Sequence, residues 1–84
     1  MSRPLVSCIV PVFNGERYLG EALDSIFAQN YEPLEVVVVN DGSTDGTARV
    51  LAKYSKRLIC LDQENQGPAA CRNLGVSVSR GEFV

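Results

Sequence analysis

The chain alternates between continuous apolar runs and apolar residues at helical spacing. Residues 5–13, LVSCIVPVF, and residues 34–40, LEVVVVN, are rich in branched side chains, which is typical of strands that are covered on both faces. Between these runs, apolar residues recur at offsets of three, four, seven and eight, which predicts one face of a helix. The residues of this face are Leu19, Ala22, Leu23, Ile26 and Phe27.

A second helix is predicted after the second run. Ser43 or Thr44 is placed to cap its first turn, because a hydroxyl oxygen accepts a hydrogen bond from a free backbone N–H there. Its inward-facing residues would be Ala48, Leu51 and Tyr54.

Strand and helix signals continue to the last residue of the sequence. Residues 57–63, RLICLDQ, predict a third, shorter strand. Pro68 suits the first turn of a third helix, and apolar residues spaced by four would face inward from it, namely Ala70, Leu74 and Val78. Gly81 ends this helix, and residues 82–84 look like the start of a fourth strand.

Strands that alternate with helices indicate an α/β fold in which right-handed crossovers join parallel strands into one sheet. The expected architecture is Rossmann-like with three layers, and the 84 residues form one domain at most. Ligands of such sheets bind beyond the carboxyl ends of the strands. The polar residues at those ends are Asn14 and Glu16 after the first strand, Asn40, Asp41 and Ser43 after the second, and Glu64, Asn65 and Gln66 after the third.

Composition and charge exclude several classes of protein. Hydrophobic residues make up 45% and charged residues 21% of the chain, which is ordinary for a globular domain. The net charge of -2 gives no basic surface, so nucleic acid is not expected as a partner. A structural zinc site is excluded, because the chain has three cysteines and no histidine.

Cysteine usage and hydropathy indicate the compartment. Cys8, Cys60 and Cys71 lie in apolar surroundings in the sequence and are expected to be small buried side chains in a reducing environment. The N-terminal apolar run is too short for a signal peptide, and no run approaches the ~20 apolar residues of a membrane span. A cytoplasmic location is therefore expected.

The turn NDGSTDG after the second strand allows three interpretations. Asp41 and Ser43 would simply cap the following helix in one of them. A calcium loop of the EF-hand type is rejected, because Ala52 occupies the position of the last acidic ligand and a strand precedes the turn. A dinucleotide site of the GxGxxG type is also rejected, because the turn after the first strand reads PVFNGER. A carboxylate that points into a ligand crevice remains as the third.

Three motifs resemble those of family-2 glycosyltransferases with the GT-A fold. The segments VSCIVPVFNGERYLGEALDSIFAQNY, LEVVVVNDGSTDGT and NQGPAACRNLG look like successive motifs of that family, in the same order and on the same elements. The resemblance covers nearly the whole chain, from about residue 5 to residue 84. It implies the strand order three-two-one, with a fourth-strand stub beside the first strand. Residues 1–84 would be the N-terminal, nucleotide-sugar-binding segment of the family's domain.

The resemblance also implies roles for individual residues. Asp41 would accept a hydrogen bond from the base. Pro11 and Phe13 would line the base and ribose site, although many members have tyrosine where this chain has Phe13, so only stacking is retained there. The remaining candidates for nucleotide binding are Asn14, Glu16, Asn40, Ser43 and Arg72. Of these, Glu16 would reach ribose or base, Arg72 would lie near the base or diphosphate, and many members have aspartate at the position of Asn40.

A carboxylate only accepts hydrogen bonds, so Asp41 would favour bases with a ring N–H, which are uracil, thymine and guanine. The expected donor is thus a UDP-, dTDP- or GDP-sugar, and the expected acceptor is a hydroxyl of a sugar, lipid or polysaccharide, with inversion at the transferred sugar. Family members carry a DxD-type motif for a divalent metal, Mn or Mg, and an acidic general base further along the chain. We expect the full-length enzyme to use both and to act in the cytoplasm or at the cytoplasmic face of a membrane, and we expect this segment alone to bind no metal.

Two alternatives stay open: a non-catalytic nucleotide-binding module, and a structural or assembly fragment. The first strand also raises an expectation about association. Only the short stub at residues 82–84 would cover its outer edge, and an uncovered apolar edge is a template for pairing with another chain. A homo-oligomer is therefore expected for the fragment.

Overall fold

The structure is a computed structural model and describes residues 4–83. Its strands are β1 (Val6–Val12), β2 (Leu34–Asp41), β3 (Ile59–Gln63) and β4 (Glu82–Phe83), and its helices are α1 (Leu19–Ala28), α2 (Thr47–Ala52) and α3 (Pro68–Val78). All strand pairs are parallel, and the sheet order is β3-β2-β1-β4. The predicted α/β fold, the parallel sheet and the position of the fourth-strand stub are therefore confirmed.

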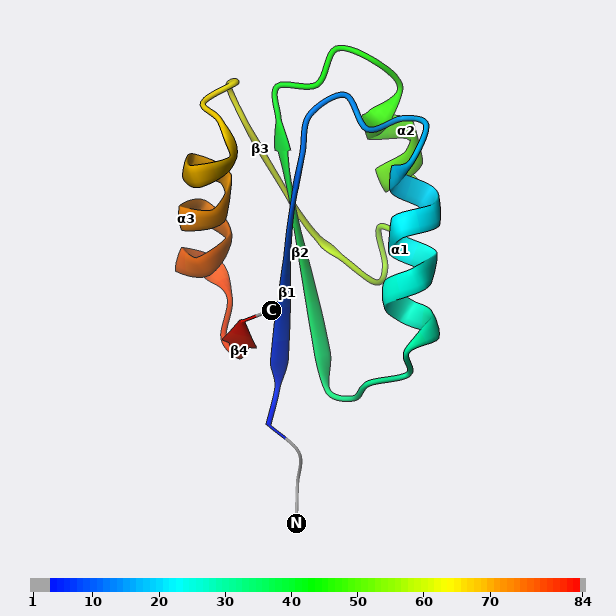
Figure 1. The fold of residues 1–84 in the computed structure, drawn as a ribbon, viewed down its shortest axis with the longest axis vertical. Helices are drawn as coiled ribbons and strands as arrows, with labels where there is room; N and C mark the ends of the chain where they lie inside the picture. The colour runs from blue at the N-terminus through cyan, green and yellow to red at the C-terminus, as the bar shows by residue number, and fades with distance from the viewer. Residues whose placement is uncertain (1–3, 84) are drawn as a thin grey trace.

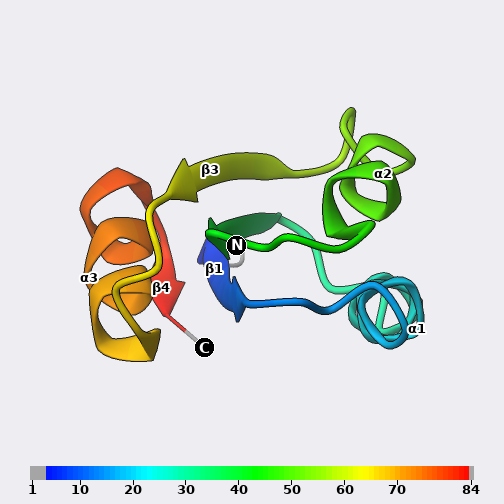
Figure 2. The ribbon, with the colours of Figure 1, turned by 90° about the horizontal axis from the view of Figure 1, so that it is seen from above.

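The elements form three layers. Helices α1 and α2 cover one face of the sheet and α3 covers the other (Figures 1 and 2). Among residues 4–83, no helix is long and apolar enough to cross a bilayer.

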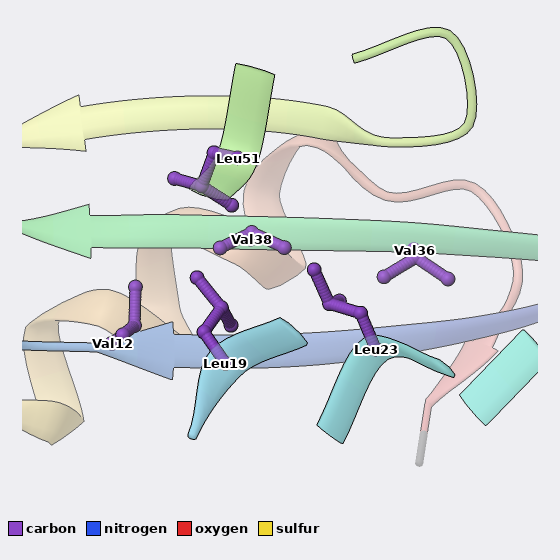
Figure 3. Packing of buried hydrophobic residues seen from close by; sticks show 6 residues of the cluster. All are labelled: Val12, Leu19, Leu23, Val36, Val38 and Leu51. Atoms are coloured by element: carbon purple, nitrogen blue, oxygen red, sulfur yellow. The ribbon is translucent and has the colours of Figure 1, made fainter. Parts of the chain in front are cut away.

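Strand β2 supplies both halves of the core. Val36 and Val38 pack toward α1 and α2, in a cluster that also contains Leu19 and Leu23 (Figure 3). The alternate residues of the strand, Val37 and Val39, pack toward α3. Because successive side chains of a strand point to opposite faces, a strand between two helical layers must be apolar on both. This explains the run of four valines.

The outer edge of β1 is only partly covered. Strand β4 pairs with β1 at Val6 and Ser7, and the described residues provide no strand partner beyond that point. The expected association depends on this edge. Val84, the last residue of the predicted stub, lies outside the described residues, as do residues 1–3.

Helix α2 begins later than the sequence predicts. Its first residue is Thr47, and neither Ser43 nor Thr44 caps it. Instead, the Asp45 carboxylate accepts hydrogen bonds from the backbone N–H and the hydroxyl of Thr47, because the turn continues for three further residues before helical geometry starts. The later start shifts the buried face of the helix. Leu51 is buried, whereas Ala48 is exposed.

The buried face of helix α3 is shifted from the predicted one, although Leu74 packs against the core as expected. Cys71 and Gly75 are its buried residues, while Val78 is exposed. The helix approaches β1 closely at Gly75, where a side-chain carbon would collide with Ile9.

The expectation of buried cysteines is wrong for Cys60, which is exposed because β3 is the edge strand of the sheet.

A polar junction connects the amino ends of β1 and β2 with the segment that follows α3. The buried Ser7 hydroxyl donates to Glu35 Oε2 at 2.6 Å and accepts from the backbone N–H of Gly81 at 2.9 Å. Glu35 Oε2 also accepts from the Arg80 N–H at 3.0 Å. The Ser7 hydroxyl and the Arg80 N–H both lower the pKa of the Glu35 carboxyl, and the hydroxyl has the larger effect. The junction thereby holds β4 in register against β1.

This junction makes part of the stability depend on pH. Because the folded-state pKa of Glu35 is lowered, its ionised form stabilises the fold above the unfolded-state pKa, and this contribution is lost as the pH falls through the folded-state pKa. Glu35→Gln should lower the free energy of unfolding at pH 7 and reduce its loss on acidification. Urea denaturation at several pH values measures both effects. Glu32→Gln, at an exposed position, is the control, and equal pH profiles for Glu35→Gln and the wild type would contradict the assignment.

Candidate functional site

A cavity of about 350 Å³ lies beyond the carboxyl ends of the strands. Its lining residues are Pro11, Val12, Phe13, Asp41, Asn65, Gly67, Pro68 and Cys71. A larger hollow of about 630 Å³ lies beside the amino end of β2, lined by residues that include Phe27, Leu34 and Arg57. Ligands of parallel α/β sheets bind at the carboxyl ends, and only the smaller cavity contains a buried carboxylate. We therefore place the candidate site there.

The Asp41 carboxylate is the central polar group of the cavity. It ends β2, and the residue is 4% exposed. Its Oδ1 accepts hydrogen bonds from Gln63 Nε2 and the Gln66 N–H, both at 2.8 Å, and its Oδ2 accepts from the Gly67 N–H at 2.9 Å. Hydrogen bonds lower the pKa of Asp41, with the largest effect from the Gln63 amide and the next from the Gln66 N–H. Burial acts in the opposite direction but has a smaller effect. The carboxylate is thus ionised at neutral pH and acts as an acceptor.

Gly42 allows this arrangement. Its φ of 73° lies in the left-handed region, which glycine adopts without steric cost. A side-chain carbon at this position would also press on the backbone of Asn65. The β2–α2 turn and the β3–α3 loop therefore lie against each other, and both border the cavity.

The loops after β1 and β2 are joined by a set of reciprocal hydrogen bonds, which we call the loop clasp. The Asn14 N–H donates to Ser43 Oγ at 2.9 Å, and Asn14 Oδ1 accepts from the Thr44 N–H at 2.8 Å. Likewise, the Glu16 N–H donates to Asp45 Oδ2 at 3.1 Å, while Glu16 Oε1 accepts from the Gly46 N–H at 2.9 Å.

The clasp also shifts a pKa and contains one unusual backbone conformation. Asp45 has a lowered pKa, chiefly because the Thr47 hydroxyl donates to it. Asn14 adopts a φ of 51°, a left-handed conformation in which asparagine is more common than most residues. The carboxylates and amides of the clasp mainly bind the two loops to each other.

The predicted site residues fall into two groups and one outlier. Pro11, Phe13 and Asp41 line the cavity, and Phe13 is 49% exposed, so its ring is accessible. The residues of the second group lie in the loop clasp or beside it: Asn14, Glu16, Asn40 and Ser43. Asn40 is buried, and its Oδ1 accepts from the Ser43 N–H at 3.2 Å. Arg72 is exposed on α3 and is not one of the residues that line the cavity.

The structure adds residues that the sequence reasoning did not assign. Gln63 donates to Asp41, and Cys71 and Pro68 form part of the cavity wall. A signal for Gln63 was present, since it ends the third strand and pairs in register with Asp41. Cys71 gives no such signal, because an apolar helix position reads the same whether it faces a core or a cavity.

Within residues 4–83, no three cysteine, aspartate or glutamate side chains gather closely enough to hold a metal ion. Binding through hydrogen bonds and stacking is the chemistry that these residues support.

Comparison with known proteins identifies relatives over almost the whole chain. The chain is 44% identical over 82 residues to the glycosyltransferase GlyA of Streptococcus pneumoniae serotype 4 and 38% identical over 84 residues to GlyG of the same organism. These alignments cover 94% and 95% of this chain, but only 12% of GlyA and 28% of GlyG. The chain thus spans about a quarter of the length of these relatives or less.

Solved structures give the same picture. TarS of S. aureus in complex with UDP-GlcNAc superposes with a TM-score of 0.85 at 38% identity, covering 94% of this chain and 25% of that one. A mannosyltransferase from Pyrobaculum calidifontis, in complex with GDP-Man and Mn2+, superposes with a TM-score of 0.87 at 34% identity, covering 96% and 26%. The family model for glycosyl transferase family 2 matches residues 7–84. The chain therefore belongs to glycosyl transferase family 2, with the α/β arrangement of GT-A glycosyltransferases.

Proposed function

We propose that this chain is the nucleotide-binding part of a glycosyltransferase that moves a sugar from a UDP-, dTDP- or GDP-sugar to an acceptor hydroxyl with inversion. The observation that carries the proposal is the ionised carboxylate of Asp41 at the edge of a cavity bordered by Pro11 and Phe13. Family membership and the solved relatives that hold UDP-GlcNAc or GDP-Man support it.

The base would be recognised by one hydrogen bond and one apolar contact. An ionised carboxylate accepts but does not donate, so it is matched by the ring N–H of uracil, thymine or guanine and not by the ring nitrogens of adenine or cytosine that serve as acceptors. The exposed ring of Phe13 offers a flat surface for the base or ribose. Pro11 would complete the wall on the same side.

The other predicted residues contribute mainly through position. In this proposal Asn14, Asn40 and Ser43 keep the loops after β1 and β2 at a fixed spacing, so that Phe13 and Asp41 face the same ligand. Glu16 Oε1 accepts a hydrogen bond within the loop clasp, and Glu16 Oε2 lies 3.8 Å from Arg49 Nη2 at the surface. Oε2 can therefore still accept a hydrogen bond from a ribose hydroxyl. Arg72 would act on the diphosphate electrostatically from the exposed side of α3.

The chemical step needs groups beyond those that bind the base. A divalent metal, Mn or Mg, would neutralise the leaving diphosphate when bound, and an acidic general base would take the proton of the acceptor hydroxyl. Residues 4–83 provide no cluster of metal ligands. In this proposal the chain binds and orients the nucleotide, and the acceptor is a sugar, lipid or polysaccharide.

Within this proposal, the first prediction concerns base selectivity. UDP and GDP should bind at least about tenfold more tightly than CDP and ADP, because the wrong bases leave the Asp41 carboxylate without a donor, a loss of roughly one charged hydrogen bond. Asp41→Asn should remove most of this preference. Titration calorimetry measures the affinities, and thermal melting checks that each variant is folded.

The control for that experiment is Asp62→Asn, which removes an exposed carboxylate from the neighbouring strand. It should leave the order of affinities unchanged. Tighter binding of ADP than of UDP by the wild type would refute the role given to Asp41.

The second prediction concerns activity. The 84-residue chain should neither transfer nor hydrolyse the sugar of UDP-GlcNAc or GDP-mannose, with or without manganese, because residues 4–83 supply no metal-ligand cluster. Release of UDP or GDP is the measurement. Turnover that scales with this polypeptide and survives repurification would show that the chain contains catalytic groups not recognised above.

A further inference from the structure

Gln63 donates a hydrogen bond to Asp41 from the neighbouring strand of the sheet, with its Nε2 2.8 Å from Asp41 Oδ1. It is the last residue of β3, and the parallel register places it directly beside Asp41 on β2. The same Nε2 donates to Cys71 Sγ at 3.2 Å. The amide of Gln63 is therefore held between the carboxylate and the thiol.

The two oxygens of the Asp41 carboxylate are not equivalent. Oδ1 accepts from Gln63 Nε2 and from the Gln66 N–H, and each carboxylate oxygen has about two acceptor positions. Oδ2 accepts one backbone hydrogen bond, from the Gly67 N–H. The Cys71 thiol also interacts with the carboxylate, but a thiol is a weak donor that a stronger N–H can replace. Oδ2 is thus the oxygen with capacity for a ligand.

From this geometry we propose that Gln63 is a positioning residue that keeps Oδ1 of Asp41 occupied and presents Oδ2 to the base of the nucleotide. The inference rests on the proposed function, and it deepens that function by assigning the base contact to one oxygen and by naming the side chain that fixes it. Gln63 itself does not line the cavity.

Rotation of the carboxylate explains why a side-chain donor is needed. The terminal torsion of aspartate has a broad, roughly twofold profile, so a donor from a paired strand adds a constraint to those from the backbone of the β3–α3 loop. Gln63 lies on a paired strand and therefore provides a fixed donor. Cys71, 1% exposed on α3, accepts from the same amide and limits its rotation in turn. Burial and the nearby Asp41 charge raise the pKa of the Cys71 thiol, so it stays neutral.

Two substitutions test the proposal. Gln63→Met keeps length and volume but removes the donor, and it should raise the pKa of the Asp41 carboxyl and reduce the preference for UDP over CDP about tenfold. Gln63→Glu should make UDP binding depend on pH. At acidic pH the introduced carboxyl is protonated and donates to Asp41, so binding approaches that of the wild type, and it weakens as this proton is lost.

The measurements are titration calorimetry with UDP and CDP at several pH values, and an NMR titration of the Asp41 side-chain carbonyl without nucleotide. Gln29→Met, at the exposed end of α1, is the matched control and should change neither. A merely structural role for Gln63 would not produce binding that recovers on acidification in Gln63→Glu. If Gln63→Met does not fold, this recovery decides the question.

The outcomes separate the two proposals. If the wild type prefers UDP over CDP while Gln63→Met keeps the wild-type selectivity and Asp41 pKa, the inference about Gln63 is wrong and the proposed function stands. If the wild type binds no nucleotide, the proposed function is refuted and the inference fails with it.

Discussion

The burial of β2 on both faces is the constraint on which the rest of the structure depends. The side chains of Val36 to Val39 are at most 2% exposed, and they alternate between the core under α1 and α2 and the core under α3. A strand packed in this way cannot shift its register by one residue without moving every side chain to the other layer. Its carboxyl end is therefore fixed, and Asp41 is the residue at that end.

Fixing a carboxylate at the end of a buried strand has an electrostatic cost, which the surrounding loops offset. Removal from water disfavours the charged form, while N–H donors favour it. At Asp41 the donors have the larger effect, and they come from β3 and from the loop that precedes α3. The same bonds that keep the group ionised also hold the β3–α3 loop against the sheet, so the charge and the shape of the cavity are coupled.

Sequence reasoning succeeded where a pattern spans a whole element. The valine run of β2, the helical spacing of α1 and Pro68 at the start of α3 each led to an element of the right type. Together with the motifs, they were sufficient for the sheet order and for the family. Asp41 was singled out because it lies at the carboxyl end of a buried strand, which the sequence alone indicates, and its role in binding stays a prediction.

The details that sequence reasoning missed depend on contacts between elements. The Asp45 carboxylate, and not the Ser43 hydroxyl, accepts from the first N–H of α2, because Ser43 is engaged with the loop after β1. Cys71 faces the cavity and Val78 faces solvent because the close approach at Gly75 sets the rotation of α3. Such choices among several polar or small residues become visible only when the distance between two loops or two elements is known.

The close contact between Gly75 and Ile9 fixes the length of helix between β1 and the cavity. Gly75 lies eight positions after Gly67, the last residue before the helix, and at 1.5 Å per residue this corresponds to about 12 Å. An insertion of one residue in this interval would rotate the cavity end of the helix by about 100° relative to the contact with β1. It would turn Cys71 away from Gln63 even if every strand remained in place. The number of residues between these two positions is therefore constrained by the contact with β1 at one end and by the cavity at the other.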